Sequence, residues 1–198
     1  MKTKKLYYFL FLLVLLITWS CSNIRHLPEG ELLYVGAKVK VIDSLASKKE
    51  RKALEKEFKG ILRPKPNSKI LGLRAKLYFY NLAGESKKEK GFRYWLRNKV
   101  GEPPVLFSQV DLGYSTELIK NYSENRGYFK ARALADSTRK GKRVTADFEA
   151  RPGKQYRIKS IKFPTDSTAL GMAIAATQDK TLFKTGEGYD LDRIKAER

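Results

Sequence analysis

The stretch YFKARALADSTRKGKRVTADFEA, residues 128–150, contains the clearest strand pattern in the chain. In its second half apolar and polar residues alternate strictly, in the order Val144, Thr145, Ala146, Asp147, Phe148, Glu149 and Ala150. A period of two is typical of a strand with one buried and one solvated face. Residues 128–136 are also expected to be extended, with a turn around Gly141 before the second strand. The stretch therefore predicts an antiparallel hairpin.

A helix is expected to lead directly into this hairpin. Ser108 is predicted to open it, and the sequence Asn125, Arg126, Gly127 is predicted to end it. Its expected apolar face repeats every four positions and consists of Val110, Tyr114, Leu118 and Tyr122, with Ile119 beside them.

A strand and a helix are also expected nearer the N-terminus. Residues 33–42 alternate between apolar residues and Gly or Lys, which predicts a half-buried strand. Ser47, with Glu50 three residues later, forms the pattern of a capping box. Apolar residues follow at helical spacing, namely Leu54, Phe58, Ile61 and Leu62, and Gly60 and Pro64 close the helix.

Between these elements, residues 70–82 and 91–99 are predicted to be two short amphipathic helices. The charged, glycine-bounded segment ESKKEKG that joins them is expected to be a solvated loop. Tyr94 and Trp95 are expected to pack in a core while the neighbouring Arg side chains extend to solvent, with contact at a membrane interface as the alternative. After the hairpin, we expect a strand at residues 156–163, a helix at 167–176 and a last helix capped by Asp190.

The first twenty residues have the pattern of an export signal. Lys2, Lys4 and Lys5 precede an apolar run at residues 6–17, the length of a signal h-region and too short to span a bilayer as a helix. Cys21 is the only cysteine and follows at the distance of a lipoprotein cleavage site, so it is the predicted lipidation site. A plain secretory signal and an uncleaved signal anchor are the alternatives. All three place the remainder outside the cytoplasm.

The net charge of the chain indicates which kinds of partner it favours. The chain holds 41 Lys and Arg and 21 Asp and Glu; three of the basic residues lie in the export signal, which leaves a net charge of +17 in the remainder. Such a surface favours anionic partners. Export disfavours nucleic acid, so a membrane surface is the leading candidate. The basic residues are dispersed along the chain, and we expect most of them to keep the protein soluble.

Enzymatic chemistry is not expected. His26 is the only histidine, so neither a His and Cys metal site nor Ser-His catalysis can be assembled. No nucleophile-elbow, P-loop or dinucleotide-binding motif is present. We therefore predict a protein without catalytic residues, metal or cofactor.

Several motifs together resemble a known family. The helix end SENRGYFKA, the strand VTADFEA, the turn PGK and the segment QYRIKSIKF resemble the junction between two polypeptide-transport-associated (POTRA) domains. LPEGELLYVGAKVKV, LRPKPNSKILGLR and GEPPVLFSQVD resemble the N-terminal region of lipoprotein-type (TamL-like) BamA/TamA family proteins of Bacteroidetes. The resemblance implies an α+β fold of POTRA-type β-α-α-β-β modules, each a small mixed sheet with helices on one face, preceded by a signal-peptide helix.

The resemblance also implies a domain organisation. Residues 1–20 are the expected lipoprotein signal peptide and 21–30 a tether. A first POTRA-like domain is expected at 31–151, with a helical insertion at about 63–104, and a second is expected to begin at 152–198. The chain is then expected to be the N-terminal part of a longer protein with a downstream β-barrel. The segment after Cys21 lacks an acidic run, so we expect the anchored chain on the periplasmic side of the outer membrane.

Such a domain is expected to bind extended client or partner segments, including unfolded outer-membrane proteins, as an added strand at a sheet edge. The candidate edge residues are Tyr128, Phe129, Lys130, Ala131, Arg132 and Ala133. Lys130 and Arg132 are predicted to discourage edge-to-edge self-association, with Phe129, Ala131 and Ala133 packing inward. The alternative for this strand is that it is simply covered. The alternative function is a stand-alone basic lipoprotein with a structural or anionic-lipid-binding role.

Overall fold

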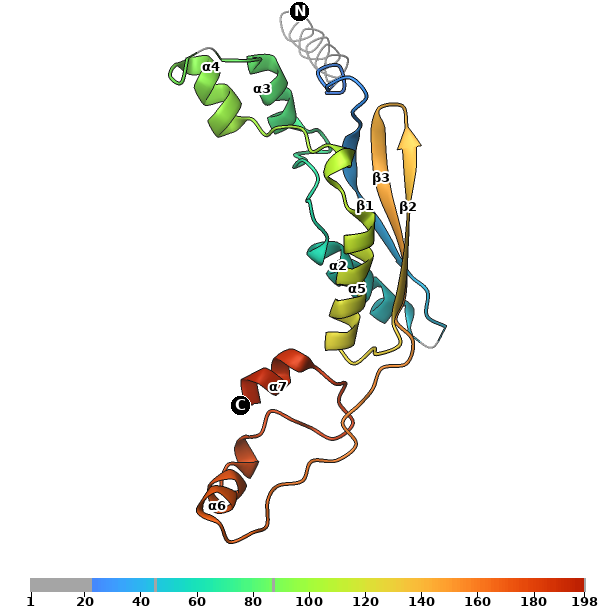
Figure 1. The fold of residues 1–198 in the computed structure, drawn as a ribbon, viewed down its shortest axis with the longest axis vertical. Helices are drawn as coiled ribbons and strands as arrows, with labels where there is room; N and C mark the ends of the chain where they lie inside the picture. Colours follow the sequence, from blue (N-terminus) through green and yellow to red (C-terminus); the bar gives the residue numbers. More distant parts are fainter. Residues whose placement is uncertain (1–22, 45, 87, 198) are drawn as a thin grey trace, which may run out of the picture. The chain divides into compact units, whose positions relative to one another are not determined.

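The computed structural model describes residues 23–44, 46–86 and 88–197 (Figure 1). The predicted signal peptide and Cys21 lie outside the described residues. The chain divides into two compact units. Unit 1 comprises Met1–Gly36, Pro64–Val110 and Ser137–Ala146, and unit 2 comprises Ala37–Arg63, Asp111–Asp136 and Asp147–Arg198. Within the described part of the chain, no helix is both long and apolar enough to cross a membrane.

The described strands form one mixed sheet. Its strands are β1 (Leu33–Val41), β2 (Arg132–Lys140) and β3 (Arg143–Arg151), in the order β1-β3-β2. Leu33 N–H donates to the carbonyl of Lys142 at 2.8 Å, and further along β1 the N–H of Ile42 donates to Ala150 at 2.8 Å. Both strands therefore run in the same direction, whereas β2 and β3 are the two arms of a hairpin. The predicted α+β class with a small mixed sheet is confirmed.

The hairpin forms as predicted in β3 and at the turn. Its apolar residues are buried and alternate with half-buried polar ones; the buried set is Val144, Ala146, Phe148 and Ala150. Gly141, with φ of +60°, is the first of two turn residues, the position where a type II′ turn takes glycine. The first arm differs from the prediction, because β2 begins at Arg132 and continues to Lys140. Residues 128–131 precede the strand.

Two helices of unit 2 lie along one face of the sheet (Figure 1). They are α2 (Lys48–Ile61) and α5 (Leu112–Asn125). The capping box of α2 is confirmed: Ser47 Oγ accepts from Glu50 N at 3.2 Å, and a Glu50 carboxylate oxygen accepts from Ser47 N at 2.7 Å. Phe58 of α2 is fully buried and meets the ring of Tyr122 edge-on, with ring centroids 5.9 Å apart.

The start of α5 was predicted wrongly. Ser108 lies in a short 3-10 helix, η2 (Phe107–Gln109), and Asp111 caps α5 by accepting from Tyr114 N at 2.8 Å. Ile119 is buried as predicted, but the other buried residues of α5 are Ser115 and Ser123 and not the four apolar residues predicted beside it. The two serine hydroxyls donate to carbonyls one turn earlier, so small polar residues fill the helix side that lies closest to its neighbours.

In unit 1, the first residues of β1 are covered on both sides. Leu33 packs with Leu27 and Leu77, and Tyr34 is also buried, so the predicted alternation of the strand holds only towards its C-terminal end. Asn23 is buried as well and donates to the carbonyl of Arg74 at 3.2 Å. Packed structure therefore begins before residue 31, and the described part of the predicted tether belongs to unit 1.

The predicted helical insertion contains α3 (Ala75–Ala83), α4 (Phe92–Trp95) and a π-helical turn, η1 (Leu96–Val100). The N–H of Gly101 donates to the carbonyl of Leu96 at 2.8 Å, which is the five-residue spacing of a π-helix. Arg97 joins η1 to α3: its guanidinium lies 3.9 Å above the ring of Tyr80 and donates to the tyrosine oxygen at 2.6 Å. Trp95 is 51% exposed, so its prediction as a core residue is wrong.

Beyond β3, unit 2 contains α6 (Ala169–Ala175), the 3-10 helix η3 (Gln178–Lys180) and α7 (Leu191–Glu197). Asp190 Oδ1 accepts from the N–H of Asp192 at 2.9 Å, which confirms the predicted cap. The strand predicted at residues 156–163 does not form. Only Arg157 makes an antiparallel bridge, to Gly188, and the rest of the segment has no described strand to pair with. Apolar spacing alone cannot stabilise a strand without a partner.

Candidate functional site

Strand β2 lies at one edge of the sheet, and no described segment adds to it as a further strand. The opposite edge, β1, is covered near its start. Tyr34 N–H donates to Val105 at 2.9 Å, Phe107 N–H donates to Leu32 at 2.8 Å, and Leu33 forms an antiparallel bridge with Leu106. Further along β1, a carboxylate oxygen of Glu55 accepts from Val41 N at 3.1 Å. Other segments of the chain therefore hydrogen-bond to the β1 edge, whereas no described segment adds a strand to the β2 edge.

The turn and the strand lengths indicate which N–H groups of β2 point away from β3. Both arms contain nine residues and are joined by two, so Arg132 lies opposite Arg151. In a hairpin with a two-residue turn, the pairs next to the turn and every second pair beyond it exchange hydrogen bonds. We infer that Ala133 and Ala135 occupy positions whose N–H groups point to the outer edge. Half-burial of both alanines, with Arg132 and Leu134 exposed, agrees with this register.

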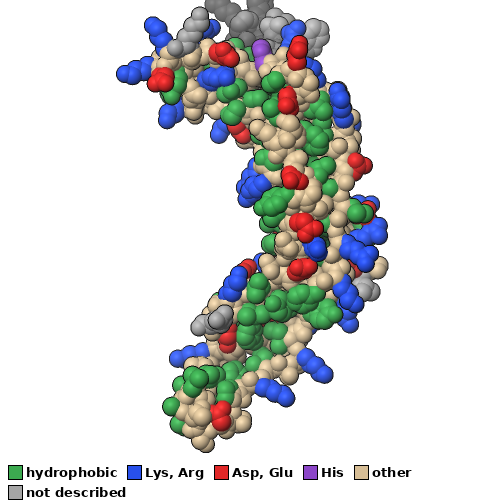
Figure 2. Space-filling view, in the orientation of Figure 1, with side chains coloured by type: hydrophobic (Ala, Val, Ile, Leu, Met, Phe, Trp, Pro, Cys, Tyr) green, Lys and Arg blue, Asp and Glu red, His purple; other side chains and the backbone are tan. Residues whose placement is uncertain are grey.

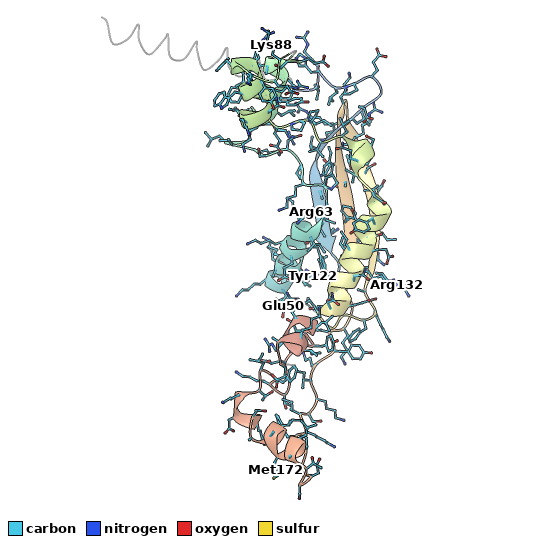
Figure 3. The ribbon with its side chains drawn as sticks, turned by 60° about the vertical axis from the view of Figure 1, so that its left-hand side comes forward. Glu50, Arg63, Lys88, Tyr122, Arg132 and Met172 are labelled. Carbon is cyan, nitrogen blue, oxygen red and sulfur yellow. The ribbon has the colours of Figure 1, made fainter. Side chains whose placement is uncertain are left out.

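The six predicted edge residues fall into two groups. Arg132 and Ala133 lie in β2, and Arg132 is exposed as expected (Figure 3). The other four, Tyr128, Phe129, Lys130 and Ala131, precede the strand. Ala131 is buried, as predicted, and its N–H donates to the carbonyl of Tyr128 at 3.1 Å within a turn. This local hydrogen bond explains why the strand starts later than the alternation of residues suggested.

Phe129 does not pack under the sheet as predicted. It is 46% exposed and its ring makes edge-on contacts with Tyr156 at 5.3 Å and Tyr189 at 5.1 Å between centroids. Both tyrosines belong to the segment after β3. Phe129 therefore holds that segment against the end of α5, a role for which the local sequence carried no signal other than its aromatic character.

Gly127 makes this contact possible. Its φ is +84°, and Tyr128 N–H donates to Ser123 at 2.9 Å while Gly127 N–H donates to Glu124 at 2.9 Å, the two bonds of a Schellman motif. A Cβ at this position would lie 2.9 Å from Tyr189 Cβ and 3.0 Å from the carbonyl oxygen of Tyr156. Glycine therefore ends the helix, as predicted, and also permits the close approach of residues 156 and 189.

A cavity of about 680 Å³ adjoins the residues that precede β2. It is lined by Asp43, Ala46, Glu50, Tyr128, Lys130 and residues 153–157. Its wall therefore presents carboxylates, a phenol, ammonium groups and the Arg157 guanidinium within one depression. A surface with both donors and acceptors matches the polar backbone of an extended chain, whose N–H and C=O groups alternate.

Burial and charge fix the protonation of two groups in this wall. Burial raises the pKa of the Tyr128 phenol, and the nearby carboxylates of Asp43 and Glu50 raise it further, so the hydroxyl keeps its proton. Hydrogen bonds from the Ser47 side chain and backbone lower the pKa of Glu50, which stays ionised. At neutral pH the cavity wall thus offers Tyr128 as a donor and Glu50 as an acceptor.

The described residues contain no cluster of His, Cys, Asp and Glu that is arranged to hold a metal ion. His26 is exposed in the segment before β1. Searches against protein-family models, curated proteins and solved structures find no match to this chain.

Proposed function

We propose that this chain is the periplasmic, POTRA-bearing region of a lipoprotein-type BamA/TamA outer-membrane assembly or translocation factor. In this proposal Cys21 carries the lipid anchor, and strand β2 binds extended segments of unfolded outer-membrane proteins or assembly partners as an added strand. The protein is not an enzyme in this proposal and uses no cofactor.

The order of elements supports the POTRA assignment. Along the chain, β1, α2, α5, β2 and β3 follow the β-α-α-β-β order, with residues 64–110 between the two helices. Both helices lie on one face of a mixed sheet, as expected for this module (Figure 1). Gly127, Tyr128 and Tyr156, from the motifs on which the family resemblance rests, lie where the segment after β3 meets the end of α5.

The observation that carries the proposed binding mode is the position of β2 at the edge of the sheet, after residues Tyr128 and Lys130, which line a cavity. Main-chain hydrogen bonds to an added strand are independent of the client's side chains, which suits a protein with many clients. Arg132 is exposed on this strand and discourages pairing between two copies of the chain.

Proline at the outward positions tests the proposal. Ala133→Pro with Ala135→Pro removes two N–H groups from the outer edge and keeps the inferred bonds to β3. The probe is a fluorescent ten-residue peptide with alternating apolar and polar residues, and fluorescence anisotropy measures its affinity. At about 1 kcal/mol for each net hydrogen bond, we expect the double variant to bind at least tenfold more weakly.

Two controls make this experiment decisive. A peptide N-methylated at every residue has no backbone N–H left to pair as a strand on either edge and should bind neither protein. Leu134→Pro removes an inferred bond to β3 and should destabilise the hairpin, which circular dichroism during urea titration would detect. If the folded double variant binds the peptide as tightly as wild type, client binding at the edge of β2 is wrong.

A further inference from the structure

The helix formed by α4 and η1 exposes two aromatic side chains on one side. Phe92 is 72% exposed and Trp95 is 51% exposed, and their rings stack with centroids 6.0 Å apart and planes 28° apart. Lys99 follows four residues after Trp95 and is also exposed, so it lies on the same side of the helix. We call this the aromatic surface of α4.

The opposite side of the same helix is held firmly. Arg97 donates to the carbonyl of Gly84 at 2.8 Å and covers the ring of Tyr80. Gly101 lies so close to α3 that a Cβ there would be 2.9 Å from Tyr80 Cα. Arg97 and Gly101 therefore determine the orientation of this helix. Phe92 and Trp95 are exposed on it, and burial of their rings does not contribute to the stability of the fold.

Basic residues outnumber acidic residues beside the aromatic surface. Lys88, which is labelled in Figure 3, is exposed, as are Lys90 and Arg93 immediately before and beside Phe92; the exposed Glu89 lies between the two lysines. The insertion as a whole, residues 63–104, contains eleven Lys and Arg and three Glu, a net charge of +8. Figure 2 shows Lys and Arg side chains extending into solvent over α3 and α4. Nearly half of the +17 net charge expected for the exported chain is thus concentrated in this insertion.

We propose that the aromatic surface of α4 docks on an anionic phospholipid bilayer. Phe92 and Trp95 enter the boundary between headgroups and acyl chains, where rigid aromatic rings are favoured, and Lys88, Lys90 and Arg93 contact anionic headgroups. This site is separate from Cys21 and from the edge of β2. In this proposal the loop ESKKEKG, which was predicted to be solvated, also contacts lipid headgroups through its lysines.

Charge and side-chain type together favour a bilayer as the occupant. An extended anionic plane attracts all of the surrounding basic residues at once, and each contributes about fivefold in affinity near such a surface. Stacked Phe and Trp with a basic surround is also the composition of interfacial helices. An acidic protein would satisfy the charge but does not specifically require two exposed rings, and it is distinguished by experiment.

Fluorescence of Trp95 reports on this contact directly. The chain has two tryptophans, so Trp19→Phe leaves Trp95 as the single reporter in the full chain. We expect its emission to shift to the blue and to be quenched when vesicles of equal parts phosphatidylglycerol and brominated phosphatidylcholine are added. Vesicles of brominated phosphatidylcholine alone should have much less effect. Quenching by bromine in the acyl chains requires insertion of the ring, so attachment through the N-terminus alone does not produce it.

Matched variants identify which residues are responsible for binding to the vesicles. Lys88→Gln with Lys90→Gln should raise the lipid concentration for half-maximal quenching about 25-fold at low ionic strength. Lys159→Gln with Lys162→Gln removes the same charge from exposed positions of unit 2 and should have little effect. Phe92→Ser should reduce the blue shift, whereas Tyr114→Ser, at another exposed aromatic, should not.

Three outcomes would overturn the proposal. One is emission from Trp95 that anionic vesicles neither shift nor quench. Another is an equal effect of the two lysine pairs, which would indicate general electrostatic attraction without this site. The third is protection of Trp95 from quenching by iodide as the protein concentration rises in the absence of lipid. That result would mean that a second copy of the chain, and not a bilayer, covers the aromatic surface.

Discussion

Each unit of the molecule contains a pair of packed helices, and the two pairs use aromatic residues in opposite ways. In unit 2, α2 and α5 bury Phe58 completely against Tyr122. In unit 1, α3 and η1 are joined by the polar and cation-π contacts of Arg97 with Tyr80, while Phe92 and Trp95 remain exposed. An aromatic ring in an amphipathic helix is thus a core residue in one unit and a surface residue in the other.

The two helix pairs differ in the interactions that hold the helices together. A buried ring contributes through the apolar area removed from water, whereas the contact of η1 depends on a planar guanidinium and on a glycine that allows close approach. Because the second arrangement needs little apolar area, it leaves aromatic side chains available for binding. Five substitutions, in the helices of both units, test this distinction.

The largest effect is expected from Phe58→Ala. Removing a fully buried ring should lower the free energy of unfolding by about 3–5 kcal/mol, through lost burial and the cavity that remains. Phe92→Ala, at a ring 72% exposed, should change it by no more than about 0.5 kcal/mol. Urea denaturation followed by circular dichroism measures both. Similar losses for the two variants would mean that Phe92 supports the fold and that the comparison is wrong.

An intermediate effect is expected from Gly101→Ala. The new Cβ would lie 2.6 Å from the carbonyl oxygen of Arg97 and 2.9 Å from Tyr80 Cα, both backbone atoms that cannot move independently. We expect a loss of about 1–3 kcal/mol, detected by faster hydrogen exchange of α3 and η1 amides.

Gly60→Ala is the matched control for that substitution. Gly60 lies in the last turn of α2 with open space around its Cβ position, so alanine should be neutral or slightly stabilising there. If both glycine substitutions have equal effects, close packing at Gly101 does not hold η1 against α3.

The smallest effect is expected from Ser47→Ala, which removes the cap of α2 and should cost about 1 kcal/mol. Part of this cost should depend on pH. The folded-state pKa of Glu50 lies below its ordinary value of 4.5 because of hydrogen bonds from Ser47, so this stabilisation is present above that value and is lost as pH falls through the folded pKa. Urea titrations of both proteins between pH 7 and pH 3 should therefore show a difference in stability that narrows in acid. A constant difference would exclude a contribution from the Ser47 hydroxyl to the ionisation of Glu50, because alanine keeps the backbone N–H that donates to this carboxylate.

Several elements could be predicted because their signals are local. The alternation in β3, the capping box at Ser47 and the glycine that ends α5 each depend on residues within a few positions of one another. The wrong predictions have two origins. The cap of α5 is local, but Asp111 makes the bond, while the hydroxyl of Ser108 donates to the distant Glu31. Residues 156–163 had strand spacing without a strand to pair with.

For the candidate site, the sequence indicated a strand in the right part of the chain and a basic surface. It did not indicate that Tyr128 and Lys130 line a cavity, because the other walls come from residues near 43–50 and 153–157. Nor did it indicate that Trp95 is exposed. The spacing of an amphipathic helix shows that one side is apolar, but not whether another element covers that side.

The sequence by itself determined the α+β class, the hairpin, the cap of α2 and the glycine stop of α5, because each follows from local backbone preference and side-chain periodicity. Only the tertiary structure decided that β2 is an edge strand, that β1 is covered by residues 105–107 and that Phe92 and Trp95 face solvent. Exposure and edge position depend on which distant segments pack together, and no local pattern of residues contains that information.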